Sequence, residues 1–306
     1  MYSGEIAAKS KVRVKGIAFV LFAATLWGVS GTFAQYLFQK VGVNTDWLVE
    51  IRLLCSGLGL LAIACIKGDK NVFKIWRNKH YAFSLIIFSI LGMLGVQYSY
   101  FTSIKYSNSA TATVLQNLGI VVIVLYSAII SKKVPDLRET LAVILALIGT
   151  FLLATNGNFH RLSISKSALF WGVSAAVTVA FYTVYPRKLL LKYGSTVVVG
   201  WAMLIGGIVF SFFHSPLNFQ GNFSINGILA VLFVILLGTL IPFYCYFESI
   251  IYIKASEAGV LSCAEPLSAT ILAVLWLDTK FTCVELMGIL CIVSTIIILS
   301  IEKKRG

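Results

Sequence analysis

Residues 98–106 read Tyr-Ser-Tyr-Phe-Thr-Ser-Ile-Lys-Tyr, and residues 244–252 read Tyr-Cys-Tyr-Phe-Glu-Ser-Ile-Ile-Tyr. Six of the nine positions are identical, and the two copies stand 146 residues apart in a chain of 306. A second short match, Trp-Gly-Val-Ser at 27–30 and again at 171–174, has nearly the same spacing. Self-similarity at one long period indicates that the chain is a duplication of a unit of about half its length.

The composition is that of a membrane protein. The chain is 58% hydrophobic and only 12% charged, with a mean hydropathy of +0.90, whereas soluble globular proteins average roughly 45–50% apolar residues. A net charge of +13 would favour a nucleic-acid partner in a soluble protein. Here the basic residues form short runs between apolar segments, where they set the orientation of the chain. We therefore expect the lipid bilayer, and no nucleic acid, as a partner.

The six cysteines lie within or at the ends of apolar runs and form no CxxC pair. Cysteines in such positions are typical of small apolar packing residues. We expect no disulfide framework, no metal site and no cofactor.

Ten apolar runs are each long enough to cross the roughly 30 Å of membrane hydrocarbon, which takes about 20 helical residues. Each run must be helical, because unpaired backbone groups cannot face lipid and no alternating pattern indicates a barrel. The first run exceeds the roughly 7–15 apolar residues of a signal peptide. The predicted fold is an all-α membrane protein with ten transmembrane helices. They cover residues 16–38, 46–66, 81–104, 108–131, 136–155, 166–191, 195–213, 226–251, 255–277 and 281–301.

These helices form two five-helix repeats, 16–155 and 166–301, between an N-terminal tail (1–15) and a basic C-terminal tail (302–306). If the N-terminus is inside, nineteen of the 25 Lys and Arg residues lie on the inner side, so the positive-inside rule predicts that both termini are cytoplasmic, in the cell membrane. An odd number of helices in each repeat makes the second copy enter the membrane in the opposite sense. Inverted halves are the arrangement that lets one central site open to either side by alternating access.

Two further stretches carry a family resemblance. Residues 258–269 read Ala-Gly-Val-Leu-Ser-Cys-Ala-Glu-Pro-Leu-Ser-Ala, and Phe281-Thr282 precedes Gly288 by a fixed spacing at the start of the tenth helix. With ten helices in two repeats, the chain resembles the drug/metabolite transporter superfamily, in its EamA-type family. The resemblance implies a transporter of small organic solutes, with a central cavity lined largely by helices 1, 3, 4, 6, 8 and 9.

The chain departs from that family at the ends of two helices. Members often close helices 4 and 9 with a Gly-Glu pair, but here Lys132-Lys133 and Asp278-Thr279 stand in those places. Helix 4 also lacks the expected proline, because Ile120 is the counterpart of Pro266.

Glu265 is the deepest ionisable residue, about ten residues and so roughly 15 Å into the ninth helix. Pro266 follows it and cannot donate a hydrogen bond to the carbonyl of Ser262, so a kink is expected there. A carboxylate beside a broken helix turn is typical of a site for a substrate cation, a coupling proton or another coupling cation. The alternative is a protonated Glu265 that packs against a neighbouring helix.

Three other acidic or basic residues are candidates for gating. Glu248 replaces Thr102 of the first motif copy, about a turn inside the membrane. Arg52, one to two turns into the second helix, could guide an anionic solute or pair across an outer gate, but it could equally reach the headgroups. For Glu257, near Lys254, an interfacial ion pair or helix cap is the simpler interpretation.

Polar and aromatic residues gather at the depth of Glu265 and could bind a substrate through hydrogen bonds, stacking or cation–π contacts. Their alternative is packing or anchoring at the membrane interface, as expected for Trp47, Trp76 and Trp276. The predicted substrate-binding residues are Trp27, Ser30, Tyr98, Gln116, Asn117, Trp171, Tyr182, Tyr244, Ser262 and Glu265, and the predicted coupling or gating residues are Glu265, Pro266, Glu248 and Arg52.

Two other classes of function compete with transport. Residues 28–31 match the Gly-x-Ser-Gly of rhomboid proteases, but an intramembrane enzyme also needs a histidine base on another helix, and His80, His160 and His214 lie at helix ends or in loops. A channel or an inactive scaffold is the third interpretation. We predict a secondary active transporter of a small organic metabolite, an amino acid, amine or drug-like solute, and not an enzyme; direction, coupling ion and oligomeric state stay open at this stage.

Overall fold

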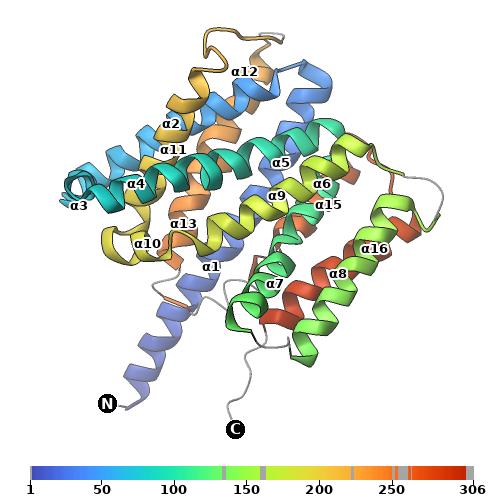
Figure 1. The fold of residues 1–306 in the computed structure, drawn as a ribbon, viewed down its shortest axis with the longest axis horizontal. Helices are drawn as coiled ribbons and strands as arrows, with labels where there is room; N and C mark the ends of the chain where they lie inside the picture. The colour runs from blue at the N-terminus through green and yellow to red at the C-terminus, as the bar shows by residue number, and fades with distance from the viewer. Residues whose placement is uncertain are drawn as a thin grey trace.

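The computed structural model describes residues 2–132, 136–158, 163–221, 224–249, 252–253, 261–262 and 264–300. Within these ranges every regular element is a helix, and Figure 1 shows the helices packed into one bundle. Six helical segments are long and apolar enough to span a membrane, and four shorter apolar helices accompany them. The all-helical class is therefore confirmed for the described part of the chain, whereas the count of ten spans and their inverted relation stay predictions.

The helices of the first half follow the predicted runs, with several interruptions. In chain order they are α1 (Tyr2–Tyr36), η1 (Leu37–Val41), α2 (Thr45–Ile66), α3 (Asn71–Lys74), η2 (Ile75–Arg77), α4 (Lys79–Ile87), η3 (Phe88–Leu94), α5 (Gly95–Tyr106), α6 (Ser109–Asn117), α7 (Gly119–Ser131) and α8 (Leu137–Thr155).

The second half is also helical where it is described. Its helices are α9 (Lys166–Val184), α10 (Arg187–Tyr193), α11 (Ser195–Ser211), α12 (Ile225–Ile235), η4 (Leu236–Leu240), α13 (Ile241–Ser249), α15 (Ala264–Leu277) and α16 (Cys283–Ser300). Of the residues discussed above, Lys133, His160, Lys254, Glu257, Cys263 and the C-terminal tail lie outside the described ranges.

Two predicted helices differ from the structure, and the predicted tail is helical. Helix α1 begins at Tyr2, so it continues through the basic stretch that was expected as a tail. The predicted helix over 166–191 stops at Val184, because Pro186 has no N–H to donate and disfavours a helical residue before it. The predicted helix over 108–131 is broken at Leu118, between α6 and α7.

Details of the two halves coincide at the spacing of the motif. The break at Leu118 lies 146 residues before Ala264, where α15 begins. Lys132 ends α7 and Asp278 follows α15; these residues are also 146 apart, and both have a left-handed backbone with φ of 51°. Glycine adopts this conformation without strain, which gives a physical reason for the glycine that the family often has there.

A π-helical turn precedes each copy of the motif. Segment η3 leads into α5, and η4 leads into α13. Pro242, two residues after η4, cannot donate to the carbonyl of Gly238, so a regular α-helix cannot be completed at that turn. Such π turns frequently occur at functional sites.

The loops divide between two ends of the bundle. At the first, which we name the His214 end, Asn44 N donates to the Gln220 carbonyl (3.2 Å) and Gln39 Nε2 to the Ser107 carbonyl (3.0 Å). The opposite end, which carries α3 and α10, is named the Lys67 end. Figure 1 shows α1 beginning and α16 ending at the lower side, away from the loop between α11 and α12 at the top.

Four helices that begin at the His214 end carry side-chain caps, which satisfy backbone N–H groups of the first turn. Asn44 accepts from Asp46 N, and Asn108 accepts from Thr111 N at 2.8 Å. Ser165 and Ser224 cap α9 and α12 in the same way. Polar caps at this end fix where the helices meet the aqueous phase.

Helices of one half pack against those of the other. Helix α2 lies along α11, α1 lies along α13 and α15, and α8 crosses α16. At that last crossing a Cβ on Gly149 would lie 2.7 Å from the Gly288 carbonyl oxygen, and a Cβ on Gly288 would lie 2.8 Å from the Gly149 oxygen. Glycine at both positions therefore lets the two backbones touch.

Candidate functional site: a central cavity between the halves

A cavity of about 210 Å³ lies at the centre of the bundle. It is lined by α1, α2, α5, α6 and α9, by η4 and α13, and by Glu265 of α15. All six helices named by the family resemblance take part, and the second helix joins them through Arg52. The lining residues are Trp27, Ser30, Gly31, Arg52, Val96, Gln97, Tyr100, Phe101, Gln116, Val179, Tyr182, Thr183, Gly238, Phe243, Tyr246, Ser262 and Glu265.

Arg52 is a buried cation at one side of this cavity, with only 4% of its surface exposed. Its Nε donates to Thr239 Oγ1 at 2.8 Å, and its guanidinium lies 4.2 Å from the centre of the Phe101 ring. Among the described residues the buried Nη1 has no hydrogen-bond partner. This burial is contrary to the alternative that Arg52 reaches the headgroups, whereas its roles toward an anionic solute or an outer gate stay predictions.

Glu265 supplies the acidic group of the cavity and lies in the first turn of α15. A carboxylate is favourable there, since the first turn of a helix presents free N–H groups and a partial positive charge. Pro266 is in the same turn, where its missing N–H leaves no bond unmade, so it lies at the start of α15. Within the described residues the Glu265 carboxylate makes no hydrogen bond or ion pair.

Two tyrosines of the repeated motif face Glu265. Tyr100, from the first copy, shares a hydrogen bond with Thr113 (2.8 Å) and interacts electrostatically with Arg52 and Glu265. Tyr246, its counterpart in the second copy, interacts with Ser262 and with the same carboxylate. The equivalent tyrosines of the two halves therefore converge on one acidic group.

The indole rings of the second repeated motif are arranged reciprocally. Trp27 of the first half lies 5.3 Å from the ring of Tyr246, in the second half. Trp171 of the second half lies 5.3 Å from the ring of Tyr98, in the first half. Each tryptophan thus packs on the motif copy of the opposite half.

The predicted substrate-binding residues separate into two groups. Those that line the cavity are Trp27, Ser30, Gln116, Tyr182, Ser262 and Glu265. Those that lie away from it are Tyr98, Asn117, Trp171 and Tyr244, together with the predicted gating residues Pro266 and Glu248.

Tyr244 and Glu248 lie instead at the Lys67 end. Lys67 Nζ donates to Tyr244 Oη at 2.6 Å and lies 3.7 Å from Glu248 Oε1. The hydrogen bond with Tyr244, and then the charge of Glu248, raise the pKa of Lys67. This cluster joins the end of α2 to α13.

Ten of the lining residues were not predicted; the polar and aromatic ones among them are Gln97, Tyr100, Phe101, Thr183, Phe243 and Tyr246. Tyr100 and Tyr246 are identical positions of the repeated motif, so their identity in both copies was the available signal. Gln97, which is buried, could have been found as a polar residue at mid-helix.

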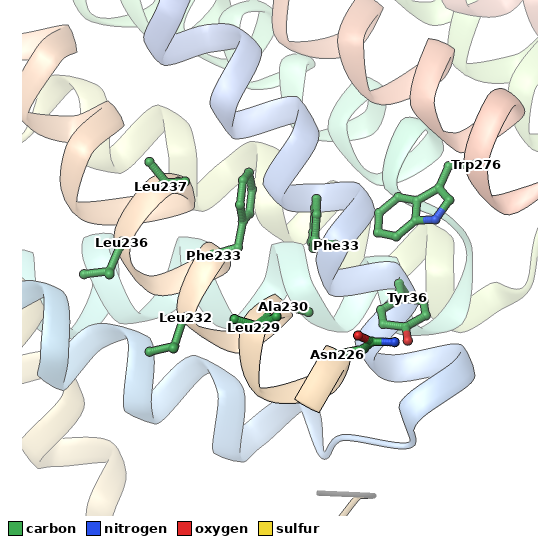
Figure 2. Close-up of a pocket in the computed structure, with 10 residues that line it drawn as sticks. All are labelled: Phe33, Tyr36, Asn226, Leu229, Ala230, Leu232, Phe233, Leu236, Leu237 and Trp276. Atoms are coloured by element: carbon green, nitrogen blue, oxygen red, sulfur yellow. The ribbon is translucent and has the colours of Figure 1, made fainter. Parts of the chain in front are cut away.

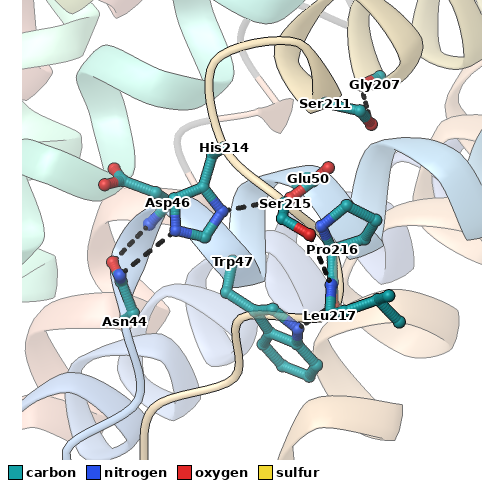
Figure 3. Close-up of polar contacts among 10 residues, drawn as sticks. All are labelled: Asn44, Asp46, Trp47, Glu50, Gly207, Ser211, His214, Ser215, Pro216 and Leu217. Atoms are coloured by element: carbon teal, nitrogen blue, oxygen red, sulfur yellow. Dashed lines mark hydrogen bonds and ion pairs between the residues drawn. The ribbon is translucent and has the colours of Figure 1, made fainter.

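The His214 end is held by a buried polar cluster. His214 Nδ1 lies 3.2 Å from Glu50 Oε2, and its Nε2 lies 3.4 Å from Asn44 Nδ2 (Figure 3). Glu50 is fully buried, and its second oxygen has no hydrogen-bond partner in the part of the chain that the structure describes. Trp47 Nε1 donates to the Pro216 carbonyl at 2.8 Å, so the loop after α11 is tied to the start of α2.

A separate apolar groove lies on the seam between α1 and the second half (Figure 2). Phe33 stacks on Phe233 with 4.2 Å between ring centres, and Trp276 stacks on Tyr36 at 5.4 Å. The expected interface anchor Trp276 therefore packs into this aromatic seam.

The arrangement gives no support to a serine protease. Within the described ranges Ser30 Oγ is buried without a hydrogen-bond partner, and a Cβ on Gly238 would lie 2.0 Å from it. Of the histidines within the described ranges, His214 contacts Glu50 and Asn44, and His80 lies on α4.

Comparison with known proteins agrees with the architecture. The sequence profile of the EamA-like transporter family matches residues 14–155 and 166–301. The chain belongs to the EamA-like transporter family. The family prediction is therefore confirmed, and both predicted repeats are covered by the match.

Relatives in this family align along nearly their whole length. The chain is 42% identical over 294 residues to YicL of Salmonella typhimurium, named as an uncharacterized inner membrane transporter, covering 95% of this chain and 97% of that protein. It is 24% identical to the transporter YwfM of Bacillus subtilis, covering 94% of each. A solved crystal structure superposes with a TM-score of 0.63 over 95% of this chain and 96% of the other, at 19% identity, which shows a shared fold. The EamA family and these transporter names point to a membrane transporter rather than an enzyme.

Proposed function

We propose that this EamA-family protein is a secondary active transporter that moves a small organic metabolite by alternating access through the central cavity. The observation that carries the proposal is the cavity itself, because both halves of the duplicated chain line it with polar and aromatic side chains. A helix that is interrupted beside such a cavity, as at Leu118, is typical of transporter binding sites.

The proposal includes the inverted arrangement of the halves and cytoplasmic termini. Tyr98 lies near Asp46 at the start of α2, and Tyr244 contacts Lys67 at its end. The 22 residues of α2 span about 33 Å at roughly 1.5 Å per residue. Equivalent residues at opposite ends of one helix support inversion.

Cysteine accessibility tests both points in a cysteine-free background. Leu217→Cys, at a position 92% exposed, should react with an impermeant thiol reagent in intact cells, and Lys70→Cys only after permeabilisation. Gln116→Cys lies in the cavity. It should react with a reagent that reaches the outer face of the protein in right-side-out vesicles, and with a reagent that reaches the inner face in inverted vesicles. Labelling of Gln116→Cys from one side only would contradict alternating access and favour a scaffold.

A channel gives a different result. It would label from both sides and would also make reconstituted vesicles leaky to small ions. A transporter should label from both sides while the vesicles stay tight.

Glu265 is the proposed site for a coupling proton or cation, because its carboxylate faces the cavity without a partner among the described residues. Uptake into vesicles driven by an imposed pH gradient should be lost in Glu265→Gln. Unchanged gradient-driven uptake in that variant would remove coupling from the proposal.

A further inference from the structure

Arg52 and Glu265 line the same small cavity and form no ion pair with each other. We propose that the cavity binds a small zwitterionic amino acid with an apolar side chain, its carboxylate on Arg52 and its ammonium group on Glu265. This inference rests on the proposed function only in taking the cavity as the substrate site.

The first charge lacks an anion. Arg52 uses Nε for Thr239, while the buried Nη1 has no hydrogen-bond partner among the described residues. The acid two residues earlier, Glu50, is turned to His214 instead. A desolvated guanidinium with an open donor is stabilised best by a carboxylate, which accepts a charge-assisted hydrogen bond.

The second charge lacks a cation. The Glu265 carboxylate forms no ion pair or hydrogen bond within the described residues. Its neighbours Tyr100 and Tyr246 already engage Thr113 and Ser262. A primary ammonium group offers three N–H donors to a carboxylate in this position.

Arg52 and Glu265 do not neutralise each other, and Tyr100 interacts with both. A ligand that carries only an amine would leave Arg52 unpaired, and one that carries only a carboxylate would leave Glu265 unpaired. A buried charge without a partner is strongly unfavourable. A zwitterion satisfies both groups at once.

The size and lining of the cavity define the rest of the ligand. Its volume of about 210 Å³ is below the roughly 300–1,000 Å³ of pockets for drug-sized molecules, so a drug-like solute is disfavoured. Trp27, Tyr182 and Phe243 give the cavity aromatic walls. These walls suit an aliphatic or aromatic side chain.

The test uses the full-length protein in detergent and measures thermal shifts and binding of defined probes. L-Phenylalanine and L-leucine are compared with phenethylamine, which lacks the carboxylate, and 3-phenylpropanoate, which lacks the amine. A ligand that binds the folded state raises the melting temperature. We expect L-phenylalanine or L-leucine to bind, and both truncated analogues to bind at least ten-fold more weakly.

Variants of Arg52 and Glu265 test which residue binds each charged group of the ligand. Arg52→Gln should bind phenethylamine as well as L-phenylalanine, and Glu265→Gln should bind 3-phenylpropanoate as well as L-phenylalanine. Arg52→Lys should keep part of the preference for the carboxylate, and Lys105→Gln, outside the cavity, should match the parent protein. If a variant does not fold, the analogue series on the parent protein decides.

Two results would overturn the inference: equal binding of an analogue and its amino acid, or no binding of either amino acid at millimolar concentration. Both results leave the proposed function intact so long as Gln116→Cys is labelled from each side in turn. One-sided labelling would reject transport whatever the probes bind.

Discussion

The two copies of the repeated motif meet opposite ends of the same helix, α2, in different surroundings. At the His214 end, Tyr98 of the first copy lies near Asp46, beside the fully buried Glu50. At the Lys67 end, Tyr244 of the second copy contacts Lys67, whose side chain is 53% exposed. Each end has a tyrosine of the motif, but the charge is buried at the His214 end and exposed at the Lys67 end.

This difference bears on how the two ends open. Charges held in water interact weakly, whereas a buried carboxylate depends on its partners. We therefore expect the His214 end to be the tighter seal and the Lys67 end to open at a smaller free-energy cost. Three substitutions test this contrast, and a last pair compares the two halves where α7 and α15 end.

The largest effect is expected from moving the charge of the second copy into the first. Thr102→Glu places a carboxylate at a position that is only 6% exposed. The free energy of unfolding should fall by about 3–5 kcal/mol, the scale for an uncompensated buried charge. Melting temperature and yield in detergent measure this loss. Thr102→Val, which keeps the shape, is the matched control, and equal stability of Thr102→Glu and Thr102→Val would contradict the burial argument.

The next effect concerns the partner of Glu50. His214→Ala removes its hydrogen bond of 3.2 Å and leaves the carboxylate without a side-chain partner. We expect a loss of about 2–3 kcal/mol, as for a buried polar group left unsatisfied. His80→Ala, at an exposed position on α4, is the control and should change stability by less than about 0.5 kcal/mol. Similar melting temperatures for the two variants would show that the His214 end is not the tighter seal.

The sequence alone predicted the features that appear in it as matching residues. The matched tyrosines and tryptophans revealed the duplication, and the stretch around Glu265 led to the family. Glu265 was also placed at the centre from its depth alone. These inferences needed only the spacing of residues along the chain.

What the sequence did not predict depends on which way a helix faces. In a membrane both faces of a helix are apolar, so periodicity does not identify the side that faces the core. Arg52 was therefore left open between an anionic solute, an outer gate and the lipid headgroups, and the structure shows it at the cavity beside Phe101. The break at Leu118 was missed because no proline marks it, and the π turns because they depend on packing as much as on local sequence.

A smaller effect is expected at the Lys67 end. Glu248→Thr restores the residue of the first copy and removes an ion pair of 3.7 Å between side chains 53% and 26% exposed. Exposed pairs contribute about 0–1 kcal/mol, so stability should hardly change. The contact survives at neutral pH, since Lys67 has a raised pKa, and on the alkaline side it is lost only above the ordinary lysine value of 10.5.

The same variant also tests the gate. If Lys67 and Glu248 hold the Lys67 end closed, Glu248→Thr should open that end more often and change transport in one direction more than in the other. The measurement compares uptake and efflux rates in vesicles of known orientation, with Lys67→Met as the matched variant. If the uptake and efflux rates both stay the same as in the parent protein, the motif has no role in gating and only records common descent.

The smallest effect compares the two halves where their helices end. Lys132 and Asp278 hold the same left-handed backbone at φ 51°, which disfavours side chains with a Cβ by roughly 1–2 kcal/mol. Glycine relieves that strain but makes the unfolded chain more flexible, which offsets about 0.4–1 kcal/mol. Lys132→Gly and Asp278→Gly should therefore each stabilise the protein by about 0.5 kcal/mol, and the two gains should add because the sites belong to different halves. The melting temperatures of both single variants and the double variant measure this. A gain at one site and a loss at the other would mean that the two halves do not share this turn in solution.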